Sequence, residues 1–272
     1  MFDKIKYELQ KNNSITILVV INVALFFIIN VSEHIFKFNL IPYLALPLNF
    51  QEFIIKPWTI VTYMFSHEGL GHVFYNMMLL YFTSKIFTNF LSEQKLVFVY
   101  LWSGVAGGLL LLLLGILLPS VFNGSFLVGA SAATIGVVAS LAFIIPELQI
   151  HLFGIFEMRY KYYALLIFVM FTIIDFTINT GGKISHFGGA FFGLFFGYLL
   201  KNGNDITKAI TFKAKKKKHL KVVHKNESMS SRSSVPSNQA TIDELLDKIS
   251  TNGYENLSKE EKELLFKLSQ KK

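Results

Sequence analysis

Three short segments carry side chains that could together break an acyl bond. They are His67-Glu68-Gly69-Leu70-Gly71-His72 followed by Asn76, Gly129-Ala130-Ser131-Ala132, and His186-Phe187-Gly188-Gly189 followed by Gly193. A serine hydroxyl becomes a nucleophile when a neighbouring imidazole takes its proton. We therefore predict that Ser131 is the nucleophile and His186 its base. No acidic residue is obviously placed to orient His186, so the expected unit is a dyad.

His72 and Asn76 are the predicted partners of the developing oxyanion. They are four residues apart, so on a helix they share one face, and each side chain offers an N–H donor. Together with the backbone N–H of Ser131 they would form an oxyanion hole. His67 precedes His72 by five residues, about 140° round a helix, which is not the spacing of an H-E-x-x-H zinc site. We expect no metal and no other cofactor.

The composition indicates where these segments must work. Of the 272 residues, 52% are apolar and only 16% are charged, which is typical of a membrane protein. The formal charge of +8 arises from Lys and Arg at the two ends and in short loops. That pattern sets topology in a bilayer and does not indicate a nucleic-acid partner. The chain has no cysteine, which excludes thiolate nucleophiles and thiolate zinc sites.

Six segments approach the length of about 20 apolar residues that a membrane-spanning helix needs. We predict spans at residues 15–31, 70–90, 96–118, 131–145, 162–178 and 184–200. Residues 32–69 are too apolar for a solvated loop and are expected to lie partly in the membrane interface. The distribution of basic residues predicts an integral, multi-pass protein of a bacterial inner membrane, with both termini cytoplasmic.

The fourth predicted span is short. About 15 residues separate Ser131 from Pro146, which is about 22 Å of helix, against a hydrocarbon core of about 30 Å. Ser131 should therefore begin a helix inside the membrane, where irregular backbone is tolerated only if protein or a water-filled cavity surrounds it. The N–H groups and the positive dipole end of that helix would suit an oxyanion.

Small residues recur at every fourth position on two of these spans. They are Ala132, Gly136 and Ser140 on the fourth span, and Gly189, Gly193 and Gly197 on the sixth. Such rows allow two helix backbones to approach closely. We expect this contact to bring the imidazole of His186 to the hydroxyl of Ser131, with Gly129 and His67 in supporting positions.

The composition divides the chain into three parts. Residues 1–200 form the predicted membrane domain, residues 201–240 a basic and serine-rich linker, and residues 241–272 a small pair of amphipathic helices. Thr241 with Glu244 and Ser258 with Glu261 are capping-box patterns. Two helices this short need a docking partner, for which we consider the membrane domain, a cytoplasmic partner or lipid headgroups.

The three motifs resemble those of rhomboid-family intramembrane serine proteases. The shared patterns are H-x4-H-x3-N at the second span, G-x-S at the fourth and H-x2-G-x3-G in the sixth. The resemblance covers about residues 14–200; Ala132 stands where the family usually has glycine, and Thr59 where an arginine is common. It implies an all-α, six-helix bundle, a Ser131–His186 dyad, an oxyanion hole from His72 and Asn76, and transmembrane protein substrates within the lipid bilayer.

Two other functions compete with proteolysis. A catalytically inactive rhomboid-like protein would bind membrane-protein clients, but the presence of both Ser131 and His186 counts against it. A transporter or channel would be expected to carry charged residues at mid-span in several helices, and these are nearly absent.

Overall fold

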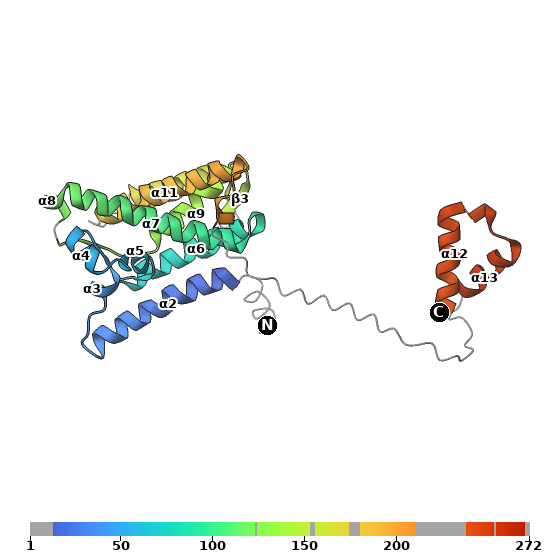
Figure 1. Cartoon of the computed structure of the whole chain (residues 1–272), viewed down its shortest axis with the longest axis horizontal. Coiled ribbons are helices and arrows are strands. Elements are labelled where there is room, and N and C mark those ends of the chain that lie inside the picture. The colour runs from blue at the N-terminus through green and yellow to red at the C-terminus, as the bar shows by residue number, and fades with distance from the viewer. Residues whose placement is uncertain are drawn as a thin grey trace. The chain divides into compact units, whose positions relative to one another are not determined.

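The computed structural model describes residues 13–122, 124–152, 156–173, 180–209, 238–252 and 254–269. These residues fall into two compact units, one within residues 1–214 and one within residues 215–272. Figure 1 shows that both are built mainly of helices. The predicted all-α architecture is therefore confirmed as far as the structure is mainly helical, but two small two-stranded sheets depart from it.

A helix lies at each of the six predicted spans. They are α2 (Asn13–His34), α6 (Leu70–Phe90), α7 (Glu93–Leu117), α9 (Ser131–Ile144), α10 (Tyr160–Thr172) and α11 (Thr180–Lys201). By length and hydropathy, two helices among the described residues, Ser14–His34 and Glu93–Leu117, could each cross a membrane unaided. Helices α9 and α10 are apolar but shorter. The end of the fifth predicted span, residues 174–178, lies outside the described residues.

Helix α9 is the centre of the larger unit, in contact with α6, α7, α10 and α11. Its core-facing residues are almost all small or β-branched, including Ala132, Ala133, Gly136 and Val137, which are buried. Three helices with small residues at their contacts can bring their backbones unusually close. Gly107 of α7 lies at such a close contact with α9 and α11. A Cβ on Gly107 would lie 2.8 Å from the Cβ of Ala132 and 2.6 Å from the carbonyl oxygen of Ser185.

The segment between α2 and α6 is a chain of short elements. They are α3 (Ile41–Leu44), β1 (Leu46–Pro47), α4 (Phe50–Ile55), α5 (Thr59–Thr62) and the 3-10 turn η1 (Tyr63–Phe65). Asn49 caps α4, since its side chain accepts hydrogen bonds from the backbone N–H groups of Gln51 and Glu52. Ile54, Ile55 and Trp58 of this segment are more than half exposed, a surface that suits the predicted interfacial position.

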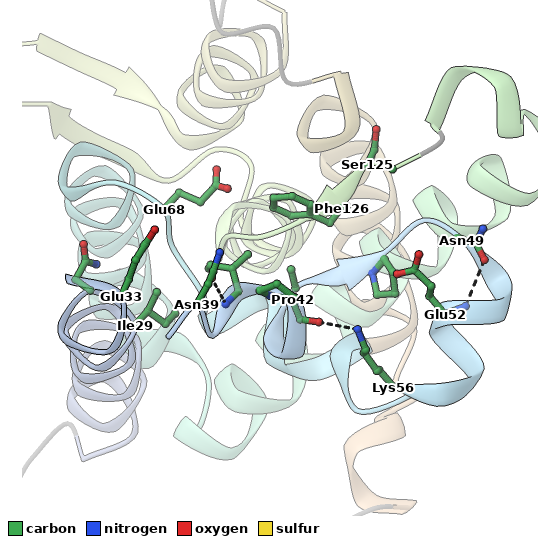
Figure 2. Close-up of a pocket in the computed structure, with 15 residues that line it drawn as sticks. Ile29, Glu33, Asn39, Pro42, Asn49, Glu52, Lys56, Glu68, Ser125 and Phe126 are labelled. Carbon is green, nitrogen blue, oxygen red and sulfur yellow. Dashed lines mark hydrogen bonds between the residues drawn. The ribbon is translucent and has the colours of Figure 1, made fainter. Parts of the chain in front are cut away.

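A second segment, between α7 and α9, pairs with the first. It contains α8 (Pro119–Phe122) and β2 (Phe126–Leu127), and β2 pairs antiparallel with β1, with Leu46 opposite Leu127. Where the two segments meet, a hollow of about 410 Å³ is lined by Glu33, Glu52 and Glu68 among other residues. Figure 2 shows these carboxylates around the hollow, and Lys56 at its edge bonded to the carbonyl oxygen of Pro42 at 3.0 Å.

An antiparallel hairpin that the sequence did not predict joins α9 to α10. Its strands are β3 (Gln149–Leu152) and β4 (Phe156–Arg159), paired from Gln149 with Arg159 to Leu152 with Phe156. Glu147 forms ion pairs with both Arg159 and Lys161. The hairpin fixes where α10 begins relative to the end of α9.

The larger unit continues past the last predicted span. Residues Ile206–Ala209 form the 3-10 turn η2, although their composition assigned them to the linker. Asp205 pairs with Lys95 at the start of α7 and accepts a hydrogen bond from Thr207. The polar composition of this stretch is therefore explained by an ion pair that holds it against the bundle.

The smaller unit consists of α12 (Asn238–Asn252), the turn η3 (Tyr254–Asn256) and α13 (Lys259–Ser269). Ser258 and Glu261 exchange the two hydrogen bonds of a capping box, as predicted. The other predicted box is wrong, because α12 begins at Asn238 and places Thr241 inside the helix. Ala240 just before Thr241 has the highest helix propensity, which favours this longer helix.

Candidate active site

Ser131 is the first residue of α9, immediately after the cap residue Ala130. Its backbone N–H is one of the first four of the helix, which have no partner within the helix. With 14 residues, α9 is about 21 Å long. This end of the helix is buried, since Ala130 and Ala132 are almost completely inaccessible to solvent.

His186 lies on α11 and faces Ser131. The Nε2 atom of His186 is 2.7 Å from the Oγ atom of Ser131, a hydrogen-bonding distance. Both helices are held in this register by the two rows of small residues. A Cβ on Gly189 would overlap the carbonyl oxygen of Ala132, and one on Gly193 would overlap that of Gly136. The structure therefore places His186 beside Ser131. It does so through the close contact between α9 and α11 that the two rows of small residues predicted.

Gly129 shapes the chain just before the serine. Its φ of +117° lies in a region that side chains with a Cβ rarely adopt. A Cβ here would also lie 2.7 Å from Nε2 of His72, and the backbone N–H of Gly129 donates to the carbonyl oxygen of Tyr63 at 2.9 Å. Glycine thus allows the loop to pass between η1 and the His72 ring.

His67 supports this loop from the side of η1. It is fully buried, and its Nε2 accepts a hydrogen bond from the backbone N–H of Ala130 at 3.4 Å. Burial and the adjacent His72 lower the pKa of His67 to about 3. A neutral ring keeps Nε2 available as an acceptor at neutral pH.

His72 and Asn76 lie in the first two turns of α6. The rings of His67 and His72 meet edge to face, with centroids 5.0 Å apart. His72 thus lies beside the loop that leads into Ser131. Asn76 is buried one turn further on, and its Nδ2 donates to the carbonyl oxygen of His72 at 2.9 Å. A side-chain amide has two N–H groups, so this bond uses one of them.

Thr172 is the site residue that the sequence did not single out. It is the last residue of α10, and its Oγ1 lies 3.2 Å from Nδ1 of His186. Both side chains are buried. A threonine near the end of an apolar helix has no distinctive spacing from the other motifs, so only the packing of α10 against α11 identifies it.

The geometry is suited to acyl transfer. Ser131 can donate its hydroxyl proton to His186 as Oγ attacks a carbonyl carbon. The N–H groups at the start of α9, where Ser131 lies, are of the kind that can hold the negative charge formed in this step. Ala130, Ala132 and His186 are buried, and electrostatic contacts at a buried site are stronger than in water.

Comparison with known families matches residues 55–203 to the Rhomboid domain. The chain belongs to the rhomboid family. That match covers more than half of the chain and includes all residues of the site described above. Rhomboid proteins are generally intramembrane serine proteases, and this family together with the long apolar helices makes the chain a membrane protein.

The C-terminal unit of this rhomboid protein matches a different family. Residues 236–271 match a family of unknown function, DUF6576, and this range includes both α12 and α13. A search of curated proteins finds no significant match to the chain.

Proposed function

We propose that this rhomboid protein is an intramembrane serine endopeptidase that cleaves transmembrane segments of other membrane proteins. The observation that carries the proposal is the 2.7 Å approach of Ser131 Oγ to His186 Nε2 at the buried start of α9. Ser131 and His186 are the catalytic residues. The backbone N–H of Ser131, with His72 and Asn76, forms the oxyanion hole.

The reaction proceeds in two halves. His186 takes the proton of Ser131 as Oγ bonds to the scissile carbonyl carbon, and then gives this proton to the leaving amine when the C–N bond breaks. A water molecule next gives a proton to His186 and attacks the acyl ester. Collapse of the second tetrahedral intermediate releases the acid product and returns the proton to Ser131.

The proposal includes a six-span topology in a bacterial inner membrane with both termini cytoplasmic. In that orientation the hairpin end of α9, with Arg159 and Lys161, faces the cytoplasm, as the positive-inside rule favours. Ser131 is then about 21 Å from that end of α9, inside a hydrocarbon core of about 30 Å. Substrate helices must unwind near their outer ends to reach it.

The test is covalent labelling by a fluorophosphonate probe, which bonds to an activated serine Oγ with loss of fluoride. The full-length protein should be labelled in detergent, and Ser131→Ala should not. His186→Ala should label far more slowly, because its serine has no base. Folded wild-type protein that resists the probe and cleaves no transmembrane substrate would favour the alternative, a catalytically inactive rhomboid protein that binds clients.

A further inference from the structure

The lengths of α9 and α10 place Thr172 at the level of Ser131. The chain turns between them so that the backbone N–H of Tyr160 donates to the carbonyl oxygen of Leu148 at 2.8 Å, and that of Lys161 to Pro146 at 3.1 Å. Helix α10 therefore starts beside the end of α9 and runs back along it. Their lengths of 14 and 13 residues correspond to about 21 Å and about 20 Å.

The hydroxyl of Thr172 lies within hydrogen-bonding distance of Nδ1, on the side of the His186 ring away from Ser131. For Nε2 to accept a proton from Ser131, the neutral ring must carry its own proton on Nδ1. An Nδ1–H then points at Thr172 Oγ1, 3.2 Å away, as a donor to its lone pair. The same bond persists when the ring becomes an imidazolium, because both ring nitrogens are then donors.

We propose that Thr172 is a positioning residue that fixes the tautomer and orientation of His186, and so couples the catalytic base to the position of α10. This inference rests on the proposed role of His186 as base. In serine hydrolases generally, holding the base in the correct tautomer is a large part of its efficiency. A hydroxyl can do this without adding a charge to a buried site.

The coupling arises from the way α10 packs. Its first turns are anchored by Tyr160 and Tyr163, which are buried, and its last residue by Thr172. Between these ends, an apolar groove of about 430 Å³ separates α10 from α9 and α11. The rings of Phe168 and Phe187 meet edge to face at 5.1 Å on this groove. A displacement of α10 at its Thr172 end would therefore break the bond to His186 before it disturbed the α9–α11 contact.

The test compares Thr172→Val with Thr172→Ser in the full-length protein. Valine keeps the shape of threonine but removes the hydroxyl that faces Nδ1 of His186, so kcat for a model transmembrane substrate should fall about tenfold with KM unchanged. Thr172→Ser should restore most of kcat. The matched control is Thr88→Val on α6, whose hydroxyl bonds to the carbonyl oxygens of Ser84 and Lys85 on its own helix. Its loss should leave kcat unchanged.

A second readout does not depend on turnover. The ¹⁵N chemical shifts of His186, assigned by comparison with His186→Ala, should indicate the Nδ1–H tautomer in the wild type and a mixture in Thr172→Val. If the valine variant does not fold, kcat and the ¹⁵N shifts of His186 are measured on Thr172→Ala instead. A folded Thr172→Val protein with wild-type kcat, or with an unchanged tautomer, would overturn the proposal. Inactive wild-type protein would overturn the proposed function instead, and the tautomer would still decide the role of Thr172.

Discussion

Gly189 of α11 lies directly against Ala132 of α9, so close that a Cβ on Gly189 would overlap the carbonyl oxygen of Ala132. The same relationship is repeated one turn further along between Gly193 and Gly136. Because His186 lies one turn from Gly189 and Ser131 adjoins Ala132, this backbone contact sets the distance between imidazole and hydroxyl. The packing of the two helices is thus part of the chemistry.

Replacing Gly189 with alanine should separate the two helices. The obstacle is backbone, which cannot move aside as a side chain would, so the expected loss of stability is near the upper end of the usual overpacking range, about 3 kcal/mol. The measurement is the thermal unfolding midpoint in detergent. Gly71→Ala is the control, because a Cβ there meets nothing within 4 Å. Equal midpoints for the two variants would contradict the proposed close contact.

Removing either member of the dyad should abolish cleavage. Ser131→Ala and His186→Ala each remove a group that the other requires, so we expect turnover of a model transmembrane substrate to reach background in both. Since the two residues act as one unit, the double variant should be no worse than either single variant. The assay follows product formation by folded, membrane-inserted protein. Substantial turnover by Ser131→Ala would rule out this nucleophile.

The oxyanion donors should matter less than the dyad. His72→Ala and Asn76→Ala each remove one donor while the backbone N–H of Ser131 remains, at a cost of about 3 kcal/mol, or about a hundredfold in kcat. Rates are compared at saturating substrate, with labelling by the fluorophosphonate as a check that Ser131 stays reactive. An Asn76→Ala variant with wild-type kcat would show that its amide serves only the carbonyl of His72.

Much of this arrangement could be predicted because the deciding signals are local and periodic. Helix positions follow from apolar length, and the rows of small residues at Ala132 and Gly189 by themselves indicate a close contact between two helices. The end of α6 at Phe90 and the start of α9 at Ser131 agree with the predicted bounds. The roles of the site residues and the number of membrane crossings remain predictions.

What could not be predicted depends on contacts between distant segments. Pairing of β1 with β2 involves only two residues in each strand, too few for a recognisable alternation. The role of Gly129 depends on where the His72 ring lies, and Thr172 reaches His186 only because α10 runs back along α9. Composition alone assigns Asp205 to a polar linker, since its partner Lys95 is more than a hundred residues earlier.

Acid should destabilise the protein through His67. Burial and His72 lower the pKa of His67 from 6.5 to about 3. The unfolded chain then binds a proton more readily than the folded one, so the contribution of neutral His67 is complete above pH 6.5. It is lost progressively as the pH falls toward 3. The thermal unfolding midpoint should therefore be much lower at about pH 5 than at about pH 7.5.

His67→Gln offers a matched comparison for this acid effect. Its side-chain oxygen can still accept a hydrogen bond from Ala130, but it has no proton to gain between these pH values. The unfolding midpoint of His67→Gln should be lower than that of the wild type at pH 7.5. As the pH falls from 7.5 to 5, it should decrease less than the wild-type midpoint does. His34→Gln, at an exposed position on α2, should keep the wild-type slope. An unchanged slope in His67→Gln would assign the acid effect to another group.

The C-terminal unit should be dispensable for the chemistry. All residues proposed for catalysis precede Leu200, and we propose that residues 238–269 act in regulation or localisation. The sequence also predicts that the Lys run at 215–218, which lies outside the described residues, is close to anionic lipid, where each basic residue contributes about 1 kcal/mol. The larger unit lies within residues 1–214 and includes the Lys95–Asp205 pair. Truncation after Ala214 should therefore keep turnover of a detergent-solubilised model substrate within a few-fold of the full chain.

A second truncation, after Asn202, tests where the catalytic unit ends. It removes Asp205 and leaves the partly buried ammonium of Lys95 without its carboxylate, so we expect a lower unfolding midpoint than for truncation after Ala214. Turnover per folded molecule should be similar in both, because neither cut reaches the site. If the protein truncated after Ala214 stays folded and membrane-inserted yet loses turnover completely, the C-terminal unit is coupled to the active site, and the modular interpretation is wrong.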